Sequence, residues 1–333
     1  MKRAAIVILN YNGRQVLPTF LPSVLQYSKF ESWVIDNAST DDSIDFLEKT
    51  YPQVPVISLP SNFGYAGGYN WGLEELRDKY KYFILLNSDV EVTPDWDSDL
   101  INRLDQNQEY AAIQPKIISW QDKKSFDYAG AGGGYLDDLG YPYCRGRIWD
   151  TIEQDKGQYN NSVEVDWASG ACMVIRATDF FGQGGFDAHF FAHMEEIDLC
   201  WRLRRAGKKI GYFGAVTVFH QGGATLDRSS PNKLYLNIRN NLSMIYKNVS
   251  LVRFFGIILV KGVLETAAAM GYLVSGKKDF ATAVFRGYRD FLKRVKWYDR
   301  PKEKPKMETS TSGPVRFIFW NYLILRRRFF NQL

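Results

Sequence analysis

The chain has 333 residues, of which 45% are hydrophobic and 24% charged. This length and composition predict one large or two ordinary globular domains and exclude a disordered protein. The charge is uneven, since residues 1–250 carry 25 Lys/Arg against 31 Asp/Glu, whereas residues 251–333 carry 17 against six. We therefore expect a mildly acidic body that does chemistry and a basic C-terminal region that meets an anionic surface.

The cysteines and the N-terminus predict the compartment. Cys144, Cys172 and Cys200 are widely spaced and form no CxxC pair, which argues against a disulfide framework or a zinc site. The apolar run 4–9 after the charged N-terminus is too short for a signal-peptide core. We expect the body to stay in a reducing cytoplasm.

Strand-like and helix-like segments alternate four times in the first 90 residues. Helices are expected at 14–27 and 43–50, and a third after a glycine-rich loop at 62–68. Continuous apolar runs predict buried strands at 4–9, 32–36, 54–59 and 82–86. The alternation predicts an open, mainly parallel α/β sheet, in which ligands bind at the carboxyl ends of the strands.

Polar clusters follow these four predicted strands, at 10–12, 36–41, 62–68 and 87–89. We expect the four segments to converge on one crevice. Asp89, in the sequence Asn-Ser-Asp, could bind Mg²⁺ or Mn²⁺ there, because both cations prefer oxygen ligands and diphosphate. An Asx-rich turn after a strand is also common without any ligand.

Two other nucleotide-binding classes are excluded by the same segments. The turn after the first strand reads Asn10-Tyr11-Asn12-Gly13 instead of GxGxxG, and the chain contains no GxxxxGK[ST]. Asp36, at the end of the second strand, could still bind a base or a ribose hydroxyl.

Residues 110–190 are less regular. Strands are expected at 111–118, 163–167 and 172–176, with a flexible loop at 130–134. Beyond them, the pattern predicts helices at 194–206 and 233–247 and a strand at 216–219.

The most informative segment opens the helix predicted at 194–206. Its first turn carries Glu195, Glu196 and Asp198, which the helix N-terminus stabilises as anions. Because an apolar and aromatic run precedes them, one carboxylate could be a partly desolvated general base, and Glu196 is the candidate. His220, at the end of the strand 216–219, is either a structural histidine or a partner of Asp89 in a metal site.

Seven ordered segments between residues 4 and 247 resemble one family. They read VILNYNG (7–13), VIDNASTDDS (34–43), NFGYAGGYNWG (62–72), LLNSD (85–89), WASGACMVIR (167–176), GGFDAHFFAHMEEIDLCWRLRRAGKKIGY (184–212) and VFHQGGATL (218–226). The chain resembles the bacterial inverting family-2 glycosyltransferases, especially their rhamnosyltransferase-like branch.

The resemblance implies a GT-A (Rossmann-like) catalytic domain at 1–230, with a nucleotide-binding half at about 1–110 and an acceptor-side half at about 111–230. It implies that Asp89 holds a divalent metal, Mg²⁺ or Mn²⁺, and that His220 lies beside the metal or the diphosphate. The acceptor side would include Trp167, Gly170 and Trp201. The nucleotide-sugar site would comprise Asn10, Asn12, Asp36, Asn37, Ser39, Asn62, Gly64, Ala66, Gly67, Asn70, Asn87 and Ser88.

The resemblance also implies a base and a reaction. The family base is usually the Asp of a Glu-Asp pair, which reads Glu195-Glu196 here, so Glu196 is the predicted base and Glu195 and Asp198 are the alternatives. The expected reaction is a single displacement from a dTDP- or UDP-linked sugar, rhamnose or another hexose. The acceptor would be a hydroxyl of a glycan or a polyprenyl-linked substrate in bacterial surface polysaccharide synthesis.

Two other functions fit the sequence less well. A nucleotidyltransferase would need a Gly-rich N-terminal loop with Arg and Lys, which the chain lacks. A non-catalytic carbohydrate- or membrane-binding protein would not require the acids at positions 89 and 196.

Residues 231–333 are predicted to be a basic, amphipathic helical region. The apolar run 251–274 is interrupted by Lys261 and Glu265, and later aromatic residues alternate with Lys and Arg. This pattern favours helices lying in an anionic membrane interface rather than spanning it, on the cytoplasmic side of the bacterial inner membrane. Nucleic acid is not the expected partner, and a homo-oligomer interface with a basic rim is the alternative.

Overall fold

The computed structural model describes residues 1–222, 230–298, 300 and 313–333. In this part of the chain, a central sheet of nine strands has the order β11-β13-β6-β12-β4-β1-β2-β3, with β5 paired to β13. Its strands are β1 (Lys2–Asn10), β2 (Glu31–Asp36), β3 (Val56–Ser58), β4 (Tyr80–Asn87), β5 (Val90–Glu91), β6 (Tyr110–Ser119), β11 (Ser162–Val165), β12 (Cys172–Arg176) and β13 (Lys209–His220). The β1–β4, β1–β2, β2–β3 and β6–β13 pairs are parallel, so the sheet is mainly parallel, as predicted.

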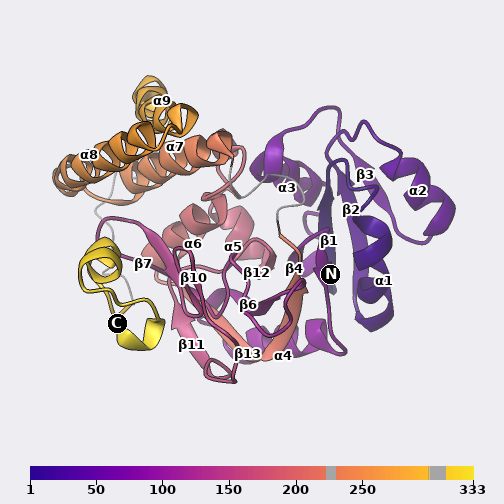
Figure 1. Ribbon diagram of the computed structural model, residues 1–333. Helices are drawn as coiled ribbons and strands as arrows, with labels where there is room; N and C mark the ends of the chain where they lie inside the picture. The colour runs from indigo at the N-terminus through magenta and orange to yellow at the C-terminus, as the bar shows by residue number, and fades with distance from the viewer. Residues whose placement is uncertain (223–229, 299, 301–312) are drawn as a thin grey trace.

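Helices cover both faces of this sheet (Figure 1). Alternate residues of β1 separate the two cores: Ile6 packs in one with Leu21 of α1, and Val7 packs in the other with Leu73 of α3. Successive side chains of a strand point to opposite faces of the sheet, so a strand buried on both faces contributes to both cores. The helices of the sheet are α1 (Leu17–Tyr27), α2 (Ser43–Thr50), α3 (Gly64–Glu75), α4 (Trp96–Gln106), α5 (Ala177–Gly182) and α6 (Glu195–Arg205), and a 3₁₀ turn, η1 (Ala188–Phe190), precedes α6.

Strand register brings the predicted polar clusters together. Asn10 is opposite Asp36, and Leu9 is opposite Asn87, so three strand ends lie side by side. His220, the last residue of β13, is opposite Val90 of β5 and therefore lies next to Asp89. The convergence expected from the sequence is thus produced by parallel pairing.

The glycine-rich segment at 62–68 is a helix rather than the predicted loop, because α3 begins at Gly64. Its glycines allow the helix to lie close to its neighbours. A Cβ on Gly72 would lie 2.1 Å from Ile35 Cδ1, and one on Gly67 would lie 2.8 Å from Phe63 Cβ. The segment is glycine-rich because it packs closely. From the sequence alone, glycines needed for close packing look the same as glycines of a flexible loop.

A second, four-stranded antiparallel sheet occupies part of the irregular region 110–170, and the sequence did not predict it. Its strands are only two or three residues long, so they carry no clear alternation. They are β7 (Gly134–Leu136), β8 (Pro142–Cys144), β9 (Arg147–Ile148) and β10 (Thr151–Ile152). The predicted flexible loop at 130–134 ends in β7. The three cysteines are free and buried.

Three long helices form a layer beside the body, and the C-terminal segment lies near the small sheet (Figure 1). Helix α7 packs against both α6 and α9. In the C-terminal segment, Phe319 packs edge-on against Trp149, and Phe330 stacks on Tyr135. The long helices are α7 (Pro231–Asn248), α8 (Leu251–Val274) and α9 (Lys278–Arg294), and the short turns are η2 (Val295–Trp297), η3 (Trp320–Ile324) and η4 (Phe330–Gln332).

Candidate active site

A cavity of about 550 Å³ lies at the carboxyl ends of β1 and β4, between the sheet and α7. Six of the predicted nucleotide- or metal-binding residues line it: Asn37, Asn62, Gly64, Asn87, Ser88 and Asp89. Five residues predicted for the acceptor, the base or the metal line it as well: Trp167, Gly170, Glu195, Glu196 and His220. One cavity therefore joins the two predicted halves of the site.

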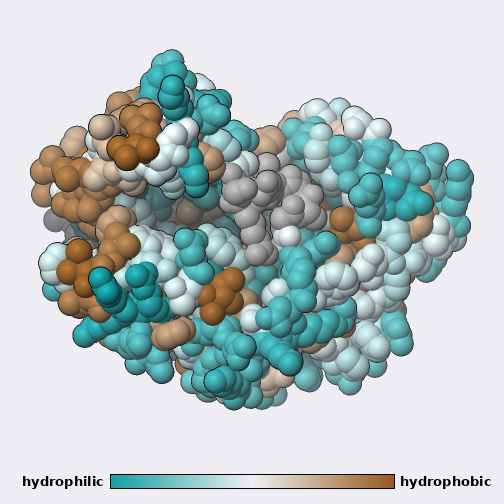
Figure 2. Space-filling view, in the orientation of Figure 1, coloured by the Kyte–Doolittle hydropathy of each residue, from teal (hydrophilic) through white to brown (hydrophobic). Residues whose placement is uncertain are grey.

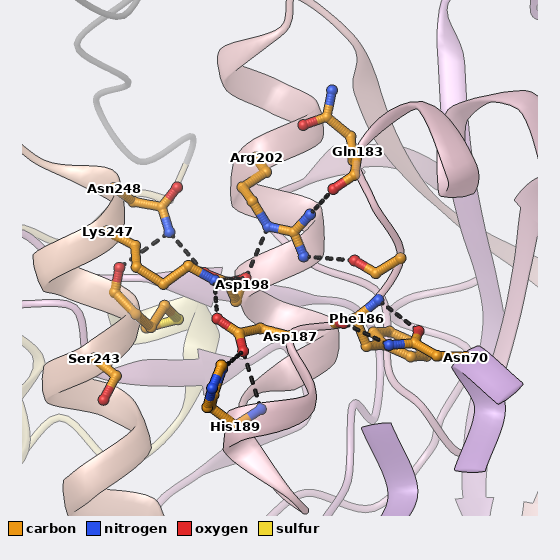
Figure 3. Close-up of polar contacts among 12 residues, drawn as sticks. Asn70, Gln183, Phe186, Asp187, His189, Asp198, Arg202, Ser243, Lys247 and Asn248 are labelled. Carbon is orange, nitrogen blue, oxygen red and sulfur yellow. Dashed lines mark hydrogen bonds and ion pairs between the residues drawn. The ribbon is translucent and has the colours of Figure 1, made fainter. Parts of the chain in front are cut away.

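Other predicted residues do not line this cavity: Asn10, Asn12, Asp36, Ser39, Ala66, Gly67, Asn70, Asp198 and Trp201. Trp201 is only 5% exposed and packs in the hydrophobic core, so the structure does not bring it to the acceptor side. Asn70 instead holds the chain before α6, since its amide donates to the Phe186 carbonyl and accepts from the Phe186 N–H, at 2.7 and 2.9 Å (Figure 3).

The predicted nucleotide residues next to the cavity form a hydrogen-bonded network. Asp36 is fully buried and accepts from the Asn10 amide at 2.8 Å and from the backbone N–H and hydroxyl of Ser39 at 2.9 and 2.6 Å. Asn12 accepts from the Thr40 N–H at 2.7 Å. These contacts fix the turns after β1 and β2 relative to each other.

Asn37 connects this network to the start of α3. Its amide donates to Asn62 Oδ1 and to the Gly64 carbonyl, both at 3.0 Å, and it accepts from the Phe63 N–H at 3.0 Å. Gly64 has a φ of +70°, and a Cβ there would lie 2.3 Å from the Phe191 carbonyl oxygen. A glycine is required at this position by both its backbone angle and its close neighbour.

His220, at the end of β13, lies between two carboxylates, those of Asp89 and Asp127. His220 Nε2 lies 3.2 Å from Asp89 Oδ1, and His220 Nδ1 lies 2.9 Å from Asp127 Oδ1. Burial alone would lower the pKa of His220, but the two carboxylates outweigh it and raise that pKa to about 10. For Asp89, burial acts to raise the pKa, yet His220 and the Gly222 N–H hold it below its usual value.

This cluster fits a divalent cation that shares its coordination with a substrate. Among residues 1–222, 230–298, 300 and 313–333, no group of three or more His, Cys, Asp and Glu side chains could hold a metal by itself. Asp89 is one suitable donor, and His220 Nε2 would be a second once a bound cation displaced its proton, with Asp127 on Nδ1 orienting the ring. Mg²⁺ is commonly bound by one or two protein ligands together with substrate phosphates and water, so the donor set fits.

Glu195 and Glu196 lie across the cavity from this cluster, at the start of α6. One carboxylate oxygen of each, Oε2, is buried and has no hydrogen-bond partner among the described residues. Burial raises the pKa of both, well above the usual value for Glu195 and to about 7 for Glu196. Backbone N–H groups of Glu196, Ile197 and Gly170 stabilise the Glu196 anion, so Glu196 ionises before its neighbour.

Asp198, the other candidate base, is tied into buried ion pairs (Figure 3). Its Oδ2 accepts from Arg202 Nε and Lys247 Nζ, each at 2.8 Å, and its Oδ1 accepts from the Asn248 amide at 2.9 Å. Lys247 also pairs with Asp187 at 2.7 Å. Both oxygens of Asp198 are occupied and lie outside the cavity, so its contacts assign it to joining α6 and α7 rather than to taking a proton.

The loop before α6 is held in an unusual conformation. Phe191, His193 and Met194 have φ values of 66°, 71° and 73°, which non-glycine residues rarely adopt. The fully buried Asn240 of α7 donates to the carbonyls of Phe190, Ala192 and His193 at 3.0, 2.8 and 2.7 Å. Strained backbone of this kind is retained where surrounding contacts impose it, often at functional sites.

Several cavity residues were missed from the sequence. Asp127, Tyr128, Arg147 and Trp149 come from the irregular region around the small sheet, and Lys233 comes from α7. Arg147 lies over the Tyr128 ring at 4.2 Å. No periodic signal marks such short segments, and only the density of aromatic and basic residues there could have drawn attention to them.

Residues 5–175 match the family described as Glycosyl transferase family 2. Since that match covers half of the sequence, the chain belongs to this family, and the resemblance noted from its motifs is confirmed. It is a family-2 glycosyltransferase of the rhamnosyltransferase-like kind.

Two relatives are similar to this chain over a longer stretch than the family match covers. The low-salt glycan biosynthesis hexosyltransferase Agl10 of Haloferax volcanii is 24% identical over 266 residues, 78% of this chain and 82% of its own length. The N-acetylglucosaminyl-diphospho-decaprenol L-rhamnosyltransferase of Mycobacterium tuberculosis is 26% identical over 247 residues, 69% of this chain and 79% of its own length.

The fold has solved neighbours as well. The crystal structure of GalNAc-T7 with UDP, GalNAc and Mn²⁺ superimposes with a TM-score of 0.58 at 14% identity, covering 89% of this chain and 57% of that one. The predicted GT-A fold is therefore confirmed.

Proposed function

We propose that this protein is an inverting glycosyltransferase that transfers a hexose, with rhamnose as the first candidate. The donor would be a dTDP- or UDP-linked sugar, and the acceptor a hydroxyl of a glycan or of a lipid-linked substrate. The observation that carries the proposal is the pairing, within one cavity, of the Glu196 carboxylate with the Asp89–His220 cluster. Surface polysaccharide synthesis is the proposed biological setting, because the relatives are a hexosyltransferase of glycan biosynthesis and a rhamnosyltransferase.

The donor is expected to lie across the ends of β1, β2 and β4. Asn10, Asn12, Asp36 and Ser39 would hold the nucleoside, and Asn37, Asn62 and the first turn of α3, with Gly64, Ala66 and Gly67, would shape its pocket. Asn87 and Ser88 would contact the diphosphate. Because the Asn10–Asp36–Ser39 network is already hydrogen-bonded, it is organised before the donor binds.

Asp89 and His220 are the residues that would hold Mg²⁺ or Mn²⁺. When bound, such a cation would neutralise the negative charge that develops on the leaving diphosphate. GalNAc-T7 was crystallised with Mn²⁺ and UDP, which supports testing both cations here. Asp127 would keep the His220 ring oriented.

Glu196 would act as the base. It takes the proton of the acceptor hydroxyl while that oxygen bonds to the anomeric carbon, and the bond from this carbon to the diphosphate oxygen breaks. The attack from the opposite face inverts the anomeric configuration. A raised pKa suits this role, because the base must accept a proton near neutral pH and hold it in the transition state.

A thermal-shift panel tests the proposal most simply. We expect one dTDP- or UDP-sugar to raise the melting temperature in the presence of Mn²⁺ or Mg²⁺, and the shift to shrink with EDTA and in Asp89→Asn. A panel without any stabilising nucleotide sugar, on correctly folded protein, would contradict the proposal and favour a non-catalytic function.

The C-terminal region is proposed to bind the cytoplasmic surface of the bacterial inner membrane. Figure 2 shows hydrophobic residues gathered over α8 and over the C-terminal segment. The most exposed of the large ones include Val252, Phe255, Leu259, Val263, Val274, Trp320 and Ile324. Among the described residues, α8 is the one helix long and apolar enough to cross a membrane.

Peripheral binding is favoured over spanning because α8 is attached to the body by buried charges. Lys261 is 1% exposed, pairs with Glu265 at 3.0 Å and lies 3.2 Å from the centre of the Tyr141 ring. A helix fixed in this way presents its other face to the membrane interface, and exposed Lys and Arg residues of this basic region would contact anionic headgroups. Flotation with anionic liposomes tests this, and a protein that stays unbound at moderate salt would contradict it.

A further inference from the structure

Arg147 is a buried cation, and the charge of Asp127 acts on it from beyond the distance of an ion pair. It is 6% exposed and lines the cavity, and among the described residues no carboxylate forms an ion pair with it. Its guanidinium donates to the Trp149 carbonyl at 3.3 Å and to Cys144 Sγ at 3.6 Å, and it lies over the Tyr128 ring at 4.2 Å. Its Nε is buried and has no hydrogen-bond partner in the part of the chain that the structure describes.

Such an arrangement is costly unless an anion completes it. A buried charge is normally paired, and a buried N–H group normally finds an acceptor. The guanidinium is a planar fork that matches phosphate oxygens, so a phosphate is the group that best fits the unpaired Nε. The neighbouring Arg145 is also buried and, among the described residues, its Nη2 also has no hydrogen-bond partner, but it lies outside the cavity, so only Arg147 is placed to meet a bound anion.

A second positive charge lies on the other side of Tyr128. Lys233 Nζ is 5.7 Å from the centre of the same ring and also lines the cavity. Its charge reaches His193, whose pKa is lowered to about 4 first by burial and then by Lys233. Two cations therefore lie against one aromatic ring in this part of the cavity.

The same wall continues into the exposed apolar surface. Trp149, which lines the cavity next to Arg147, packs against Phe319 and Tyr322 of the C-terminal segment, with ring centres 4.9 and 5.0 Å away. Exposed Trp320 and Leu323 follow on that segment. A molecule with an anionic head and an apolar chain could therefore place its head at Arg147 and its chain along this surface.

We propose that Arg147, with Lys233 and Tyr128, forms a second anion-binding subsite, which holds the phosphate or diphosphate of a lipid-linked acceptor. This inference rests on the proposed function and specifies its acceptor as an isoprenoid-type phosphate. The subsite is separate from the Asp89–His220 cluster that is assigned to the donor diphosphate. It orients the acceptor so that its sugar hydroxyl faces Glu196.

The test measures binding of farnesyl diphosphate, farnesol and inorganic pyrophosphate to the full chain by calorimetry, without donor. The wild type should bind farnesyl diphosphate more tightly than either other probe. Arg147→Gln should weaken farnesyl diphosphate binding about 10- to 100-fold, and Lys233→Gln by less, because charge-assisted bonds to phosphate are lost. Arg145→Gln is the matched control for losing a buried arginine and should change the affinity less than about twofold.

Donor binding is measured on the same proteins with UDP and dTDP in the presence of Mn²⁺. These affinities should be unchanged in Arg147→Gln. The inference is overturned if farnesyl diphosphate binds Arg147→Gln as well as the wild type, or if the variant loses UDP or dTDP affinity to the same extent, which would assign the cation to the donor. If Arg147→Gln does not fold, Lys233→Gln decides by the same two measurements. Failure of the proposed function itself would appear differently, as absence of nucleotide-sugar binding in the wild type.

Discussion

The two walls of the cavity are built in different ways. The donor wall consists of strand ends, and polar residues next to the cavity, such as Asn10, Asp36 and Ser39, hydrogen-bond to one another. The opposite wall consists of a small antiparallel sheet, the start of α6 and helix α7, and its groups are positioned by distant parts of the chain, such as Asn240 and Lys247. The first wall is fixed by local register and the second by tertiary packing, so substitutions should affect them differently.

The largest effect is expected at the base. Glu196→Gln should lower kcat by about 10²- to 10⁴-fold with donor affinity unchanged, because only proton transfer is removed. Glu195→Gln is the matched control, and since Glu195 keeps its proton longer than Glu196, its amide should retain kcat within about tenfold. Steady-state kinetics with the donor found in the panel measures both. Equal losses in the two variants would contradict the assignment of Glu196.

Asp198→Asn sharpens the same contrast, because its expected effect is on stability rather than chemistry. Removing this buried anion leaves Lys247 and Arg202 without their shared partner, which should cost about 3–5 kcal/mol of unfolding free energy. Denaturant unfolding measures the loss. A fully stable Asp198→Asn protein with no activity would return Asp198 to the catalytic candidates.

On the donor wall, Asp89→Asn should lower kcat by about 10²- to 10³-fold, the usual cost of losing one group that stabilises the leaving charge. The substitution keeps the size of the side chain, and an amide oxygen can still accept from the Gly222 N–H. Because His220 keeps Asp127 as its other buried partner, the unfolding free energy should fall by less than in Asp198→Asn. Activity equal to the wild type at limiting metal would show that Asp89 does not hold a cation.

The pH profile tests the Glu196 environment. Since its pKa is raised to about 7 and the anion is the base, kcat/KM should fall about tenfold per pH unit below pH 7. The sign for stability is opposite: burial favours the protonated form, so the wild type loses stability as the pH rises from the usual carboxyl pKa of 4.5 to about 7. Glu196→Gln should lose less stability over this range, because only the raised pKa of Glu195 remains. A flat rate profile between pH 5 and 8 would contradict the raised pKa.

The loop before α6 should depend on Asn240. Asn240→Ala removes a donor to three backbone carbonyls and should cost about 1–3 kcal/mol of stability, together with a lower kcat as Glu196 loses its fixed position. Ser243→Ala, one turn along α7, removes a bond within the helix only and should keep kcat. If both variants had wild-type kcat, α7 would not position the base.

The smallest effect is expected on the membrane surface. Arg326→Gln and Arg327→Gln, both exposed, should each weaken partitioning into vesicles rich in phosphatidylserine by about fivefold, and leave neutral vesicles unaffected. Lys49→Gln, on α2 at the far edge of the sheet, is the control. Partitioning that is independent of lipid charge would contradict the electrostatic part of the proposal.

The donor wall could be predicted from the sequence because its information is local. Apolar runs mark the strands, and the polar residues directly after them must meet when the strands pair in parallel, as Asn10, Asp36 and Asn87 do. The start of α6 could be predicted only in part: the acidic residues marked the site, but the choice of Glu196 over Glu195 came from family resemblance.

The opposite wall could not be predicted, for physical reasons. Arg147 lies in a strand of two residues, which has no periodicity to detect. Asn240 looks like an ordinary polar residue in the helical sequence NIRNN, and its role depends on a loop 50 residues earlier. The residues of the donor wall can therefore be recognised from the sequence, whereas those of the opposite wall cannot.

The proposed reaction is a single displacement in which one carboxylate acts as the base. Time-resolved ¹H NMR of slow donor hydrolysis, in which water replaces the acceptor, tests it without knowledge of the natural acceptor. The first sugar released should have the anomeric configuration opposite to that of the donor, before mutarotation. First release of the sugar with the donor's own configuration would contradict the account, because it would require a covalent or front-side mechanism instead.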